Sequence, residues 1–323
     1  QQVTLNGEIS DMNAISCGVP QGSILGPLLF LIYIIDMNKA IKNCSVFHFA
    51  DDTNLLSWHK NEKTLQKILN KDLKTLVDWL CANRLSLNVA KTEFIVFRPP
   101  RKSLSNRIVL TLNRTKIYES TKIKYLGIIL DQRLSWRDHI NELSKKLGRA
   151  ISMLYKARHF CTLSVIKTLY YSIFNSHITY GLPVWGYAND IYLNKIIKLQ
   201  KKAIRAISFS SYREHVTPLL KKLKILNIKD LVFLKTASLI WDLEKSNLPF
   251  SLSKYFIKAN VIHAQETRFA SSGNYRVGLN SNLFQSIGAK MFNELNDKHF
   301  FTAVTKKINY TPGALLYKLL KIL

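Results

Sequence analysis

The chain has 323 residues, and its hydrophobic fraction of 47% is ordinary for a globular protein and argues against intrinsic disorder. Its 47 Lys and Arg against 21 Asp and Glu give a formal net charge of +26, which indicates a polyanionic partner, nucleic acid or an anionic membrane surface. The four cysteines are far apart and form no CxxC pair, which argues against a zinc site and a disulfide framework.

The charge is distributed unevenly along the chain. Residues 1–60 contain three basic and five acidic residues, a net charge of −2, so the remaining 263 residues carry +28. A slightly acidic segment beside a strongly basic remainder suits phosphate chemistry on a bound polyanion.

The chain begins with a predicted strand pair and a glycine-bearing loop. Residues 3–5 and 14–16, separated by turn-forming residues 6–8, are expected to pair as strands. In the loop that follows, Gly22 permits close backbone approach and Ser23 can cap a helix start. Such a loop is equally consistent with a ligand site and with a plain strand-to-helix connection.

An almost wholly apolar run, residues 28–37, follows this loop. It predicts a helix that is buried on most of its sides. The run is shorter than the ~20 residues that cross a bilayer. We therefore expect no membrane span here, and no signal peptide is visible in the chain.

The next segment predicts a tight β-hairpin with two carboxylates at its tip. Residues 46–48 and 53–56 flank a break that contains Asp51 and Asp52. Turn chemistry alone would explain these residues, because Asp tolerates left-handed conformations and bonds its own backbone. The other interpretation is a metal site, because adjacent carboxylates supply the oxygen ligands that Mg²⁺ prefers.

Strands and helices alternate up to residue 130, which predicts an α+β fold. Asn61 is expected to cap a helix that runs to about residue 83, with an apolar stripe along one side. The remaining predicted elements of this part are a strand at 94–97, a hairpin of residues 109–112 and 115–118, and a last strand at 124–130.

From residue 138 the pattern becomes helical, and a helix at 189–208 is the most informative. One side of it carries a basic stripe, Lys195, Lys198, Lys202 and Arg205. A solvated helix face would explain the stripe equally well. Residues 141–230, however, contain 16 Lys and Arg against four Asp and Glu, a net charge of +12 that favours a surface for a nucleic-acid backbone. Further helices are expected at 231–243, 287–295 and 313–323.

Several of these segments together resemble a known family. GVPQGSILGPLLFLIYI at 18–34, followed by FADD at 49–52, resembles motifs B and C of the reverse transcriptases of non-LTR retrotransposons, particularly the jockey-like group. Residues 85–88 with 91–93 resemble motif D, and Tyr125-Leu126-Gly127 resembles the primer-grip motif E. Weaker matches follow at 135–139, 180–186 and 288–295.

The resemblance implies an RNA-directed DNA polymerase that adds deoxynucleoside triphosphates to a DNA primer on an RNA template. It implies that Asp51 and Asp52 hold Mg²⁺, with Mn²⁺ as a possible substitute, and that Lys91 is the general acid for departing pyrophosphate. Residues near the incoming nucleotide and its template base would be Gly18, Pro20, Gln21, Gly22 and Ser23. The primer end would be positioned by Tyr125, Leu126 and Gly127.

The resemblance also implies a division of the chain. Residues 1–130 correspond to part of a polymerase palm with an antiparallel sheet and packed helices, residues 131–230 to a helical, basic thumb, and residues 231–323 to a C-terminal helical region without an assigned role. Motif A, which carries the family's first catalytic aspartate, has no counterpart upstream of motif B in these residues. We therefore expect a fragment that is inactive alone, of an intracellular protein of the nucleus or cytoplasm.

Two interpretations from other classes remain at this point. A non-catalytic nucleic-acid-binding relic, or a co-opted protein, would use only the basic helical region. A protein of membrane surfaces is less well supported, because the basic stripe comes without a strongly exposed apolar face.

Overall fold

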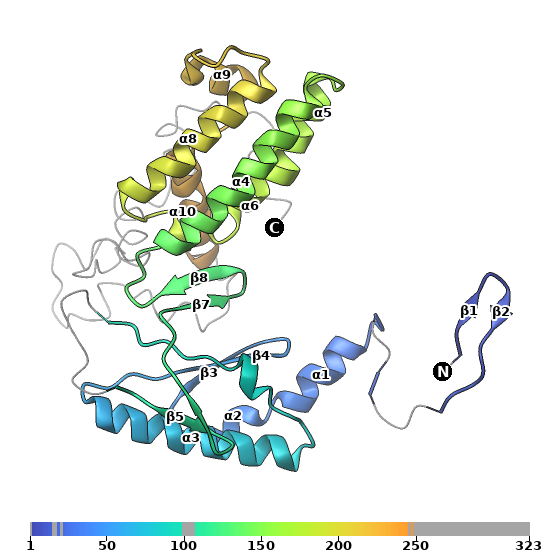
Figure 1. Cartoon of the computed structure of the whole chain (residues 1–323), viewed down its shortest axis with the longest axis vertical. Helices are drawn as coiled ribbons and strands as arrows, with labels where there is room; N and C mark the ends of the chain where they lie inside the picture. The colour runs from blue at the N-terminus through green and yellow to red at the C-terminus, as the bar shows by residue number, and fades with distance from the viewer. Residues whose placement is uncertain (1, 15–17, 20–21, 99–106, 245–246, 248–323) are drawn as a thin grey trace. The chain divides into compact units, whose positions relative to one another are not determined.

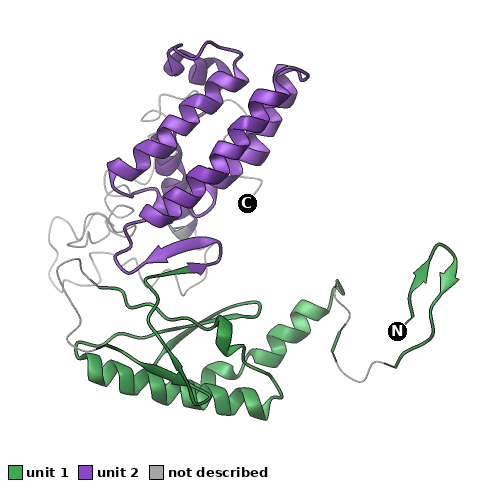
Figure 2. Ribbon diagram, in the orientation of Figure 1, with its two compact units in different colours: residues 1–123 green, residues 124–323 purple. Residues whose placement is uncertain are grey.

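A computed structural model describes residues 2–14, 18–19, 22–98, 107–244 and 247. The chain divides into two compact units, residues 1–123 and residues 124–323 (Figure 2). Helices and small two-stranded sheets make up the described residues, which confirms the predicted α+β class (Figure 1). No helix in the described ranges is both long and apolar enough to cross a membrane.

The first unit begins with a short hairpin. Strands β1 (Thr4–Leu5) and β2 (Glu8–Ile9) pair antiparallel across the turn Asn6-Gly7, whose residues have positive φ angles of 52° and 88°. The partner of the first strand was predicted at 14–16, and that prediction is wrong in its position. The two-residue turn brings the chain back at once, so Glu8 and Ile9 form the partner, while residues 15 and 16 lie outside the described residues.

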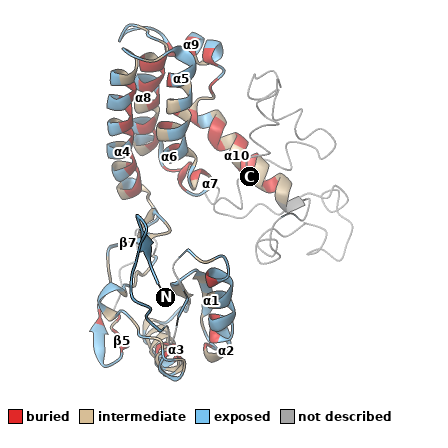
Figure 3. Ribbon diagram, turned by 90° about the vertical axis from the view of Figure 1, so that its right-hand side faces the viewer, coloured by how far each residue is buried: buried red, intermediate tan, exposed pale blue. Residues whose placement is uncertain are grey.

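Helix α1 (Gly26–Ile34) and the short helix α2 (Met37–Ala40) occupy the apolar run. The prediction of a helix buried on most sides is wrong: the side chains of Leu28, Leu29, Leu31 and Ile32 are 48–58% exposed (Figure 3). Only one side of α1, with Phe30 and Ile34, packs on a cluster from α2 and α3 (Glu62–Ala82). The apolar run predicted a helix correctly, but hydrophobicity alone does not determine how many of its side chains other elements bury.

The rest of the first unit is a long helix and two hairpins. The hairpins are β3 (Ser45–Phe49) with β4 (Asp52–Leu56), and β5 (Leu110–Leu112) with β6 (Thr115–Ile117). Asn61 caps α3 as predicted, accepting hydrogen bonds from the amides of Lys63 and Thr64. The apolar stripe of α3 packs against β5 and β6 in a cluster that includes Leu73, Ile108, Leu110, Leu112 and Ile117.

Two predicted strands differ in the structure. The segment at 94–97 makes only a single parallel bridge, between Phe94 and Glu119. The predicted strand at 124–130 is instead a hairpin of β7 (Lys122–Tyr125) and β8 (Ile128–Asp131). Leu126 and Gly127 form its turn with φ angles of 43° and 80°, a left-handed pair that reverses the chain within an otherwise continuous apolar run.

The second unit is helical after this hairpin. Its elements are α4 (Arg137–Ala157), α5 (Leu163–Leu169), the π-helical segment η2 (Tyr170–Asn175), α6 (Ser176–Thr179), α7 (Leu182–Trp185), α8 (Asp190–Ile207), α9 (Val216–Leu223) and α10 (Ile228–Glu244). The predicted helices at 189–208 and 231–243 are confirmed. Those predicted at 287–295 and 313–323 lie outside the described residues.

Helices α4 and α8 lie side by side and share the core of the second unit (Figures 1 and 3). Leu147, Leu154 and Ile204 are fully buried there with the aromatic side chains of Tyr170 and Trp185. The Gln200 amide joins this core to the turn before α10, donating to the carbonyl of Leu226 (2.9 Å) and accepting from the amide of Ile228 (3.1 Å). Both the oxygen and the nitrogen of the Gln200 side-chain amide are therefore hydrogen-bonded within an apolar core.

A buried carboxylate organises the first unit. Asp72 of α3 is only 2% exposed and accepts hydrogen bonds from the amides of Asn43 and Cys44, both at 2.8 Å, and from the Asn43 side chain at 2.7 Å. Burial by itself raises the pKa of Asp72, but these hydrogen bonds outweigh it and hold the pKa below its ordinary value. The chain is thus fixed immediately before β3 begins.

Replacing Asp72 with alanine is expected to lower the free energy of unfolding by about 2–3 kcal/mol, because two backbone amides lose a charged acceptor. Urea unfolding followed by circular dichroism measures this change. The lowered pKa adds a pH signature: the carboxylate's contribution is complete above its ordinary pKa of 3.8 and is lost as the pH falls through the folded-state value. The difference between wild type and variant should therefore shrink below about pH 4.

Asp78→Ala is the matched control, because Asp78 lies on the same helix and is exposed. Its replacement should change the free energy of unfolding by no more than about 0.5 kcal/mol. Equal losses for the two variants would contradict the anchoring role of Asp72.

Candidate functional site

The two candidate metal-binding carboxylates lie at one end of the β3–β4 hairpin. In its register Phe49 pairs with Asp52, so the two-residue turn consists of Ala50 and Asp51, and Asp52 is the first residue of β4. Both aspartates are exposed, and Ala50 adopts a left-handed φ of 50°, which is uncommon for a residue with a Cβ. The predicted hairpin is confirmed, although the turn lies one residue earlier than the Asp-Asp pair.

The hairpin is tied to the helix that precedes it through His48. Its Nε2 lies 3.1 Å from Asn38 Oδ1 of α2, and its Nδ1 lies 3.2 Å from Thr53 Oγ1 on the paired strand. A neutral ring that donates from Nε2 and accepts at Nδ1 satisfies both contacts. Burial lowers the pKa of His48, which favours this neutral form.

Asp51 and Asp52 supply donors of the type that Mg²⁺ prefers, oxygen atoms with negative charge. Within the described residues, no group of three or more His, Cys, Asp or Glu side chains is placed to hold a metal ion. The two carboxylates therefore fit the chemistry of a divalent cation but form an incomplete ligand set.

The loop before α1 is held by Ser23, whose Oγ accepts a hydrogen bond from the amide of Gly26 at 2.9 Å. Ser23 thus satisfies the amide of the first helical residue from two positions before the N-cap, which is Leu25 and makes no side-chain cap. Gly22 has a φ of 88° with open space around the position of a Cβ, so its conformation rather than close packing requires glycine. Gly18 is similar, with a φ of 83°, whereas Pro20 and Gln21 lie outside the described residues.

Lys91 ends a short 3₁₀ helix, η1 (Val89–Lys91), in the first unit. The Asn88 side chain accepts from the Lys91 amide at 3.2 Å, so the backbone is held while the ammonium group is exposed. This geometry leaves the side chain free to turn toward a ligand, and it is equally that of a surface lysine.

In the second unit, the β7–β8 turn contains the predicted primer-grip residues Leu126 and Gly127, directly after Tyr125. The Tyr180 hydroxyl donates a hydrogen bond to the Leu126 carbonyl, and Tyr180 Cε1 would lie 3.3 Å from a Cβ on Gly127. The helical core of this unit therefore supports the turn. The sequence predicted no role for Tyr180, although residues 180–186, which begin with it, weakly match the resembled family.

The predicted basic stripe lies along α8, with Lys195, Lys198 and Lys202 exposed. Two of its members make polar contacts: Lys195 Nζ donates to Asn141 Oδ1 of α4 at 3.0 Å, and Arg205 Nε donates to the Glu214 carbonyl at 2.9 Å. The opposite side of α8 is buried in the core, as predicted. The sequence pattern thus gave the correct exposed side of this helix.

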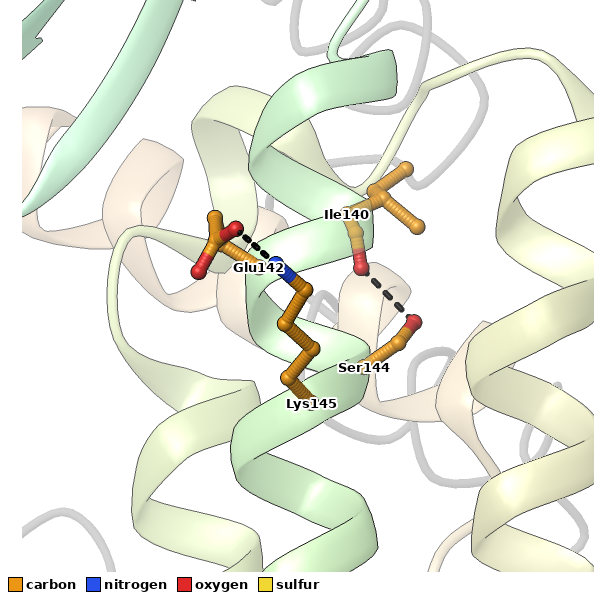
Figure 4. A network of polar contacts seen from close by, with 4 residues as sticks. All are labelled: Ile140, Glu142, Ser144 and Lys145. Carbon is orange, nitrogen blue, oxygen red and sulfur yellow. Dashed lines mark hydrogen bonds and ion pairs between the residues drawn. The ribbon is translucent and has the colours of Figure 1, made fainter.

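The neighbouring helix α4 adds further cations to this part of the second unit. Its exposed Lys145 pairs with Glu142 on the same helix at 2.6 Å, and Ser144 Oγ donates to the Ile140 carbonyl at 2.7 Å (Figure 4). Lys146 and Arg149 are also exposed on α4. An exposed ion pair such as Glu142–Lys145 contributes little to stability and locally reduces the positive charge.

Asp72 and Asn38 are the supporting residues that sequence reasoning missed. A signal for Asp72 existed, because a carboxylate occupies a position of the α3 stripe that is otherwise apolar. Asn38 gave no such signal, since its contact with His48 depends on how α2 packs beside the hairpin.

Comparison with known proteins gives a family match for the first part of the chain. Residues 3–130 match the family model for reverse transcriptase (RNA-dependent DNA polymerase). These residues are therefore similar to reverse transcriptases. The hairpin carboxylates, the loop before α1, Lys91 and the β7–β8 turn all lie within the segment that matches this family model, whereas α8 lies beyond it.

The chain is also similar to individual proteins of mobile elements, in agreement with the resemblance seen in the sequence. The chain is 29% identical over 239 residues to the RNA-directed DNA polymerase from mobile element jockey of Drosophila melanogaster, covering 71% of this chain and 26% of the relative. It is 26% identical over 235 residues to the probable RNA-directed DNA polymerase from transposon X-element of the same species, with the same coverage. The chain thus spans about a quarter of the length of these relatives. No solved structure matches it.

The conformation of the β7–β8 turn can be tested with two glycines of the second unit. Gly127→Ala should lower the free energy of unfolding by more than about 1 kcal/mol, because Gly127 has a φ of 80° and an added Cβ would press on Tyr180. Gly148→Ala, in the interior of α4 with open space around it, should raise that free energy by about 0.5–1 kcal/mol. Thermal unfolding measures both, and a loss in both variants would contradict this difference.

Proposed function

We propose that this chain is part of an RNA-directed DNA polymerase of a non-LTR retrotransposon, which extends a DNA primer on an RNA template. The observation that carries the proposal is the exposed carboxylate pair, Asp51 and Asp52, at the end of a hairpin inside the segment matched by the family model. Adjacent carboxylates on a short turn are suited to phosphoryl transfer, because the reaction requires divalent cations held at a fixed place.

In this proposal Asp51 and Asp52 hold Mg²⁺, with Mn²⁺ as the alternative ion. Bound ions of this kind activate the primer hydroxyl and neutralise charge on the triphosphate of the incoming nucleotide. Asp51, in the turn itself, would be the main ligand, and Asp52, the first residue of β4, would be the second. A third carboxylate would complete the set.

Other residues bind the substrates and move a proton. Gly18, Pro20, Gln21, Gly22 and Ser23 form the pocket for the nucleotide and its template base. Lys91, with an exposed ammonium group, donates a proton to departing pyrophosphate. Tyr125, Leu126 and Gly127 hold the primer end.

We assign residues 1–130 to a partial palm, residues 131–230 to a thumb that binds nucleic acid, and residues 231–323 to a C-terminal region without an assigned role. Because motif A of the resembled family has no counterpart in these residues, we propose that the 323-residue chain by itself is inactive. The parent protein would supply the missing carboxylate.

Primer extension on an RNA template with the parent protein tests the three charged residues. Asp51→Asn should abolish extension, because an amide carries no charge to hold two cations together. Asp52→Asn should be less severe, and Lys91→Ala should slow incorporation by about 10²–10⁴-fold while template binding stays nearly unchanged.

Lys60, which is exposed on the same unit and has no proposed role, provides the control Lys60→Ala, which should incorporate nucleotide at the normal rate. The 323-residue chain alone, in Mg²⁺ or Mn²⁺, should give no extension. Normal single-nucleotide incorporation by Lys91→Ala under chemistry-limited conditions would remove Lys91 from the mechanism. Extension by the 323-residue chain that disappears in Asp51→Ala would show that it contains a complete ligand set.

The exposed stripe on α8 supports a second part of the proposal, that the thumb binds the phosphate backbone of an RNA–DNA duplex. Replacing Lys195, Lys198, Lys202 and Arg205 with alanine should weaken binding and flatten the plot of log affinity against log salt concentration. Each lost phosphate contact removes about 0.7–0.9 from the slope, because fewer counterions are released. Fluorescence anisotropy with a labelled duplex measures the slope.

Helix α3 offers a matched control with four exposed lysines at similar helical spacing. Alanine at Lys63, Lys67, Lys71 and Lys74 removes the same charge from the first unit. This control variant should keep the salt slope nearly unchanged. If the α8 variant also kept it, the stripe would be only a solvated face.

A further inference from the structure

Helices α4 and α8 run in the same direction, so their carboxyl-terminal ends meet at one end of the second unit (Figure 1). Near their starts, Lys195 of α8 contacts Asn141 of α4. Just beyond their last residues, the Arg158 guanidinium lies 5.4 Å from the centroid of the Phe209 ring. The loop 158–162 after α4 and the loop 208–215 after α8 are therefore neighbours, and we call them the tip loops.

Three aromatic side chains of the tip loops face solvent. Phe160 is 89% exposed, Tyr212 is 72% exposed and Phe209 is 45% exposed. A single exposed aromatic residue needs no explanation, whereas three on two neighbouring loops place several exposed rings at one end of the unit. Aromatic rings at a surface are suited to stacking on flat ligands.

Cations are interleaved with these rings. The Arg158 guanidinium lies over the Tyr155 ring (5.8 Å) as well as over the Phe209 ring, so it is held in a defined place. The tip loops contain Arg158 and Arg213 against the single acidic residue Glu214, and Lys156 lies just before them in the last turn of α4. The charge of the tip loops is therefore complementary to a polyanion.

We propose that the tip loops bind single-stranded nucleic acid, with bases stacked on Phe160, Phe209 and Tyr212 and phosphates contacted by Arg158 and Arg213. Ring faces combined with cations are what a single strand requires, because its unpaired bases offer π-faces while its backbone offers negative charge. A duplex would use the cations but not the rings, because its base faces are already stacked. This site goes beyond the proposed polymerase activity and the duplex-binding stripe, and it uses different side chains.

The test compares two labelled 12-nucleotide strands of equal charge, oligodeoxythymidylate and an abasic strand, binding to the 323-residue chain in fluorescence anisotropy. Wild type should bind the base-bearing strand more tightly, by about fivefold or more for each stacked base. The double variant Phe160→Leu with Tyr212→Leu should lose most of this preference and keep the salt slope. Both residues are largely exposed, so the variant is expected to fold, and circular dichroism checks this. Arg158→Lys keeps the charge but removes the planar group, and it should weaken the preference in the same direction.

Tyr118→Leu is the matched control, because Tyr118 is 54% exposed and has the Arg107 guanidinium 5.0 Å from its ring centroid, in the first unit. This control should keep the preference for bases. Lys195→Ala with Lys198→Ala and Lys202→Ala should weaken duplex binding and leave the preference unchanged, which separates failure of the stripe from failure of the tip loops.

Equal affinity of wild type for the two strands would overturn the proposal, as would an unchanged preference in the double variant. Two further results would also overturn it, if they came without a preference for bases. One is tip-dependent binding to phosphatidylserine vesicles, which would assign the loops to a membrane surface. The other is tip-dependent self-association in sedimentation, which would assign them to a second copy of the chain.

Discussion

The geometry of the first unit depends on the buried carboxylate of Asp72. Its hydrogen bonds to Asn43 and Cys44 fix the chain one residue before β3, and a buried charge requires such partners. Burial of the Cys44 thiol, together with the hydrogen bond and charge of the nearby Asp72, raises the pKa of that thiol to about 12, so this cysteine stays protonated. The two-residue turn of Ala50 and Asp51 fixes the register of the hairpin that follows, and with it the position of Asp52 opposite Phe49.

A second carboxylate, Asp131, binds backbone amides at the point where the second unit becomes helical. Asp131, the last residue of β8, accepts hydrogen bonds from the amides of Ser135 (2.9 Å) and Trp136 (3.1 Å). Trp136 stands in a left-handed conformation immediately before α4, where few residues with a Cβ are found. These hydrogen bonds hold the residues from which α4 starts. The pairing of α4 with α8 then decides which cations lie side by side and which loops meet.

The second unit combines a fully buried core with a basic exterior on the same two helices. Ile196 and Ile204 of α8 are completely buried. Lys198, two residues after Ile196, and Lys202, two residues before Ile204, are exposed. Burial of the apolar side supplies most of the stability of such a helix, because isolated helices of this length are marginal. The exposed side is then free to carry charge for a ligand.

The sequence by itself determined the periodic and motif-borne features: the α+β class, the capped helix α3, the Asp-Asp hairpin, the exposed side of α8 and the family resemblance. These follow from local propensity, side-chain periodicity and short motifs, which act within a few residues of one another. Only the tertiary structure decided that α1 is half exposed, that residues 124–130 turn back at Leu126, and that Asp72 anchors the strand before the carboxylates. It also brought Arg158 onto Phe209, 51 residues apart in the chain. Such contacts depend on how whole elements pack, and no local pattern encodes them.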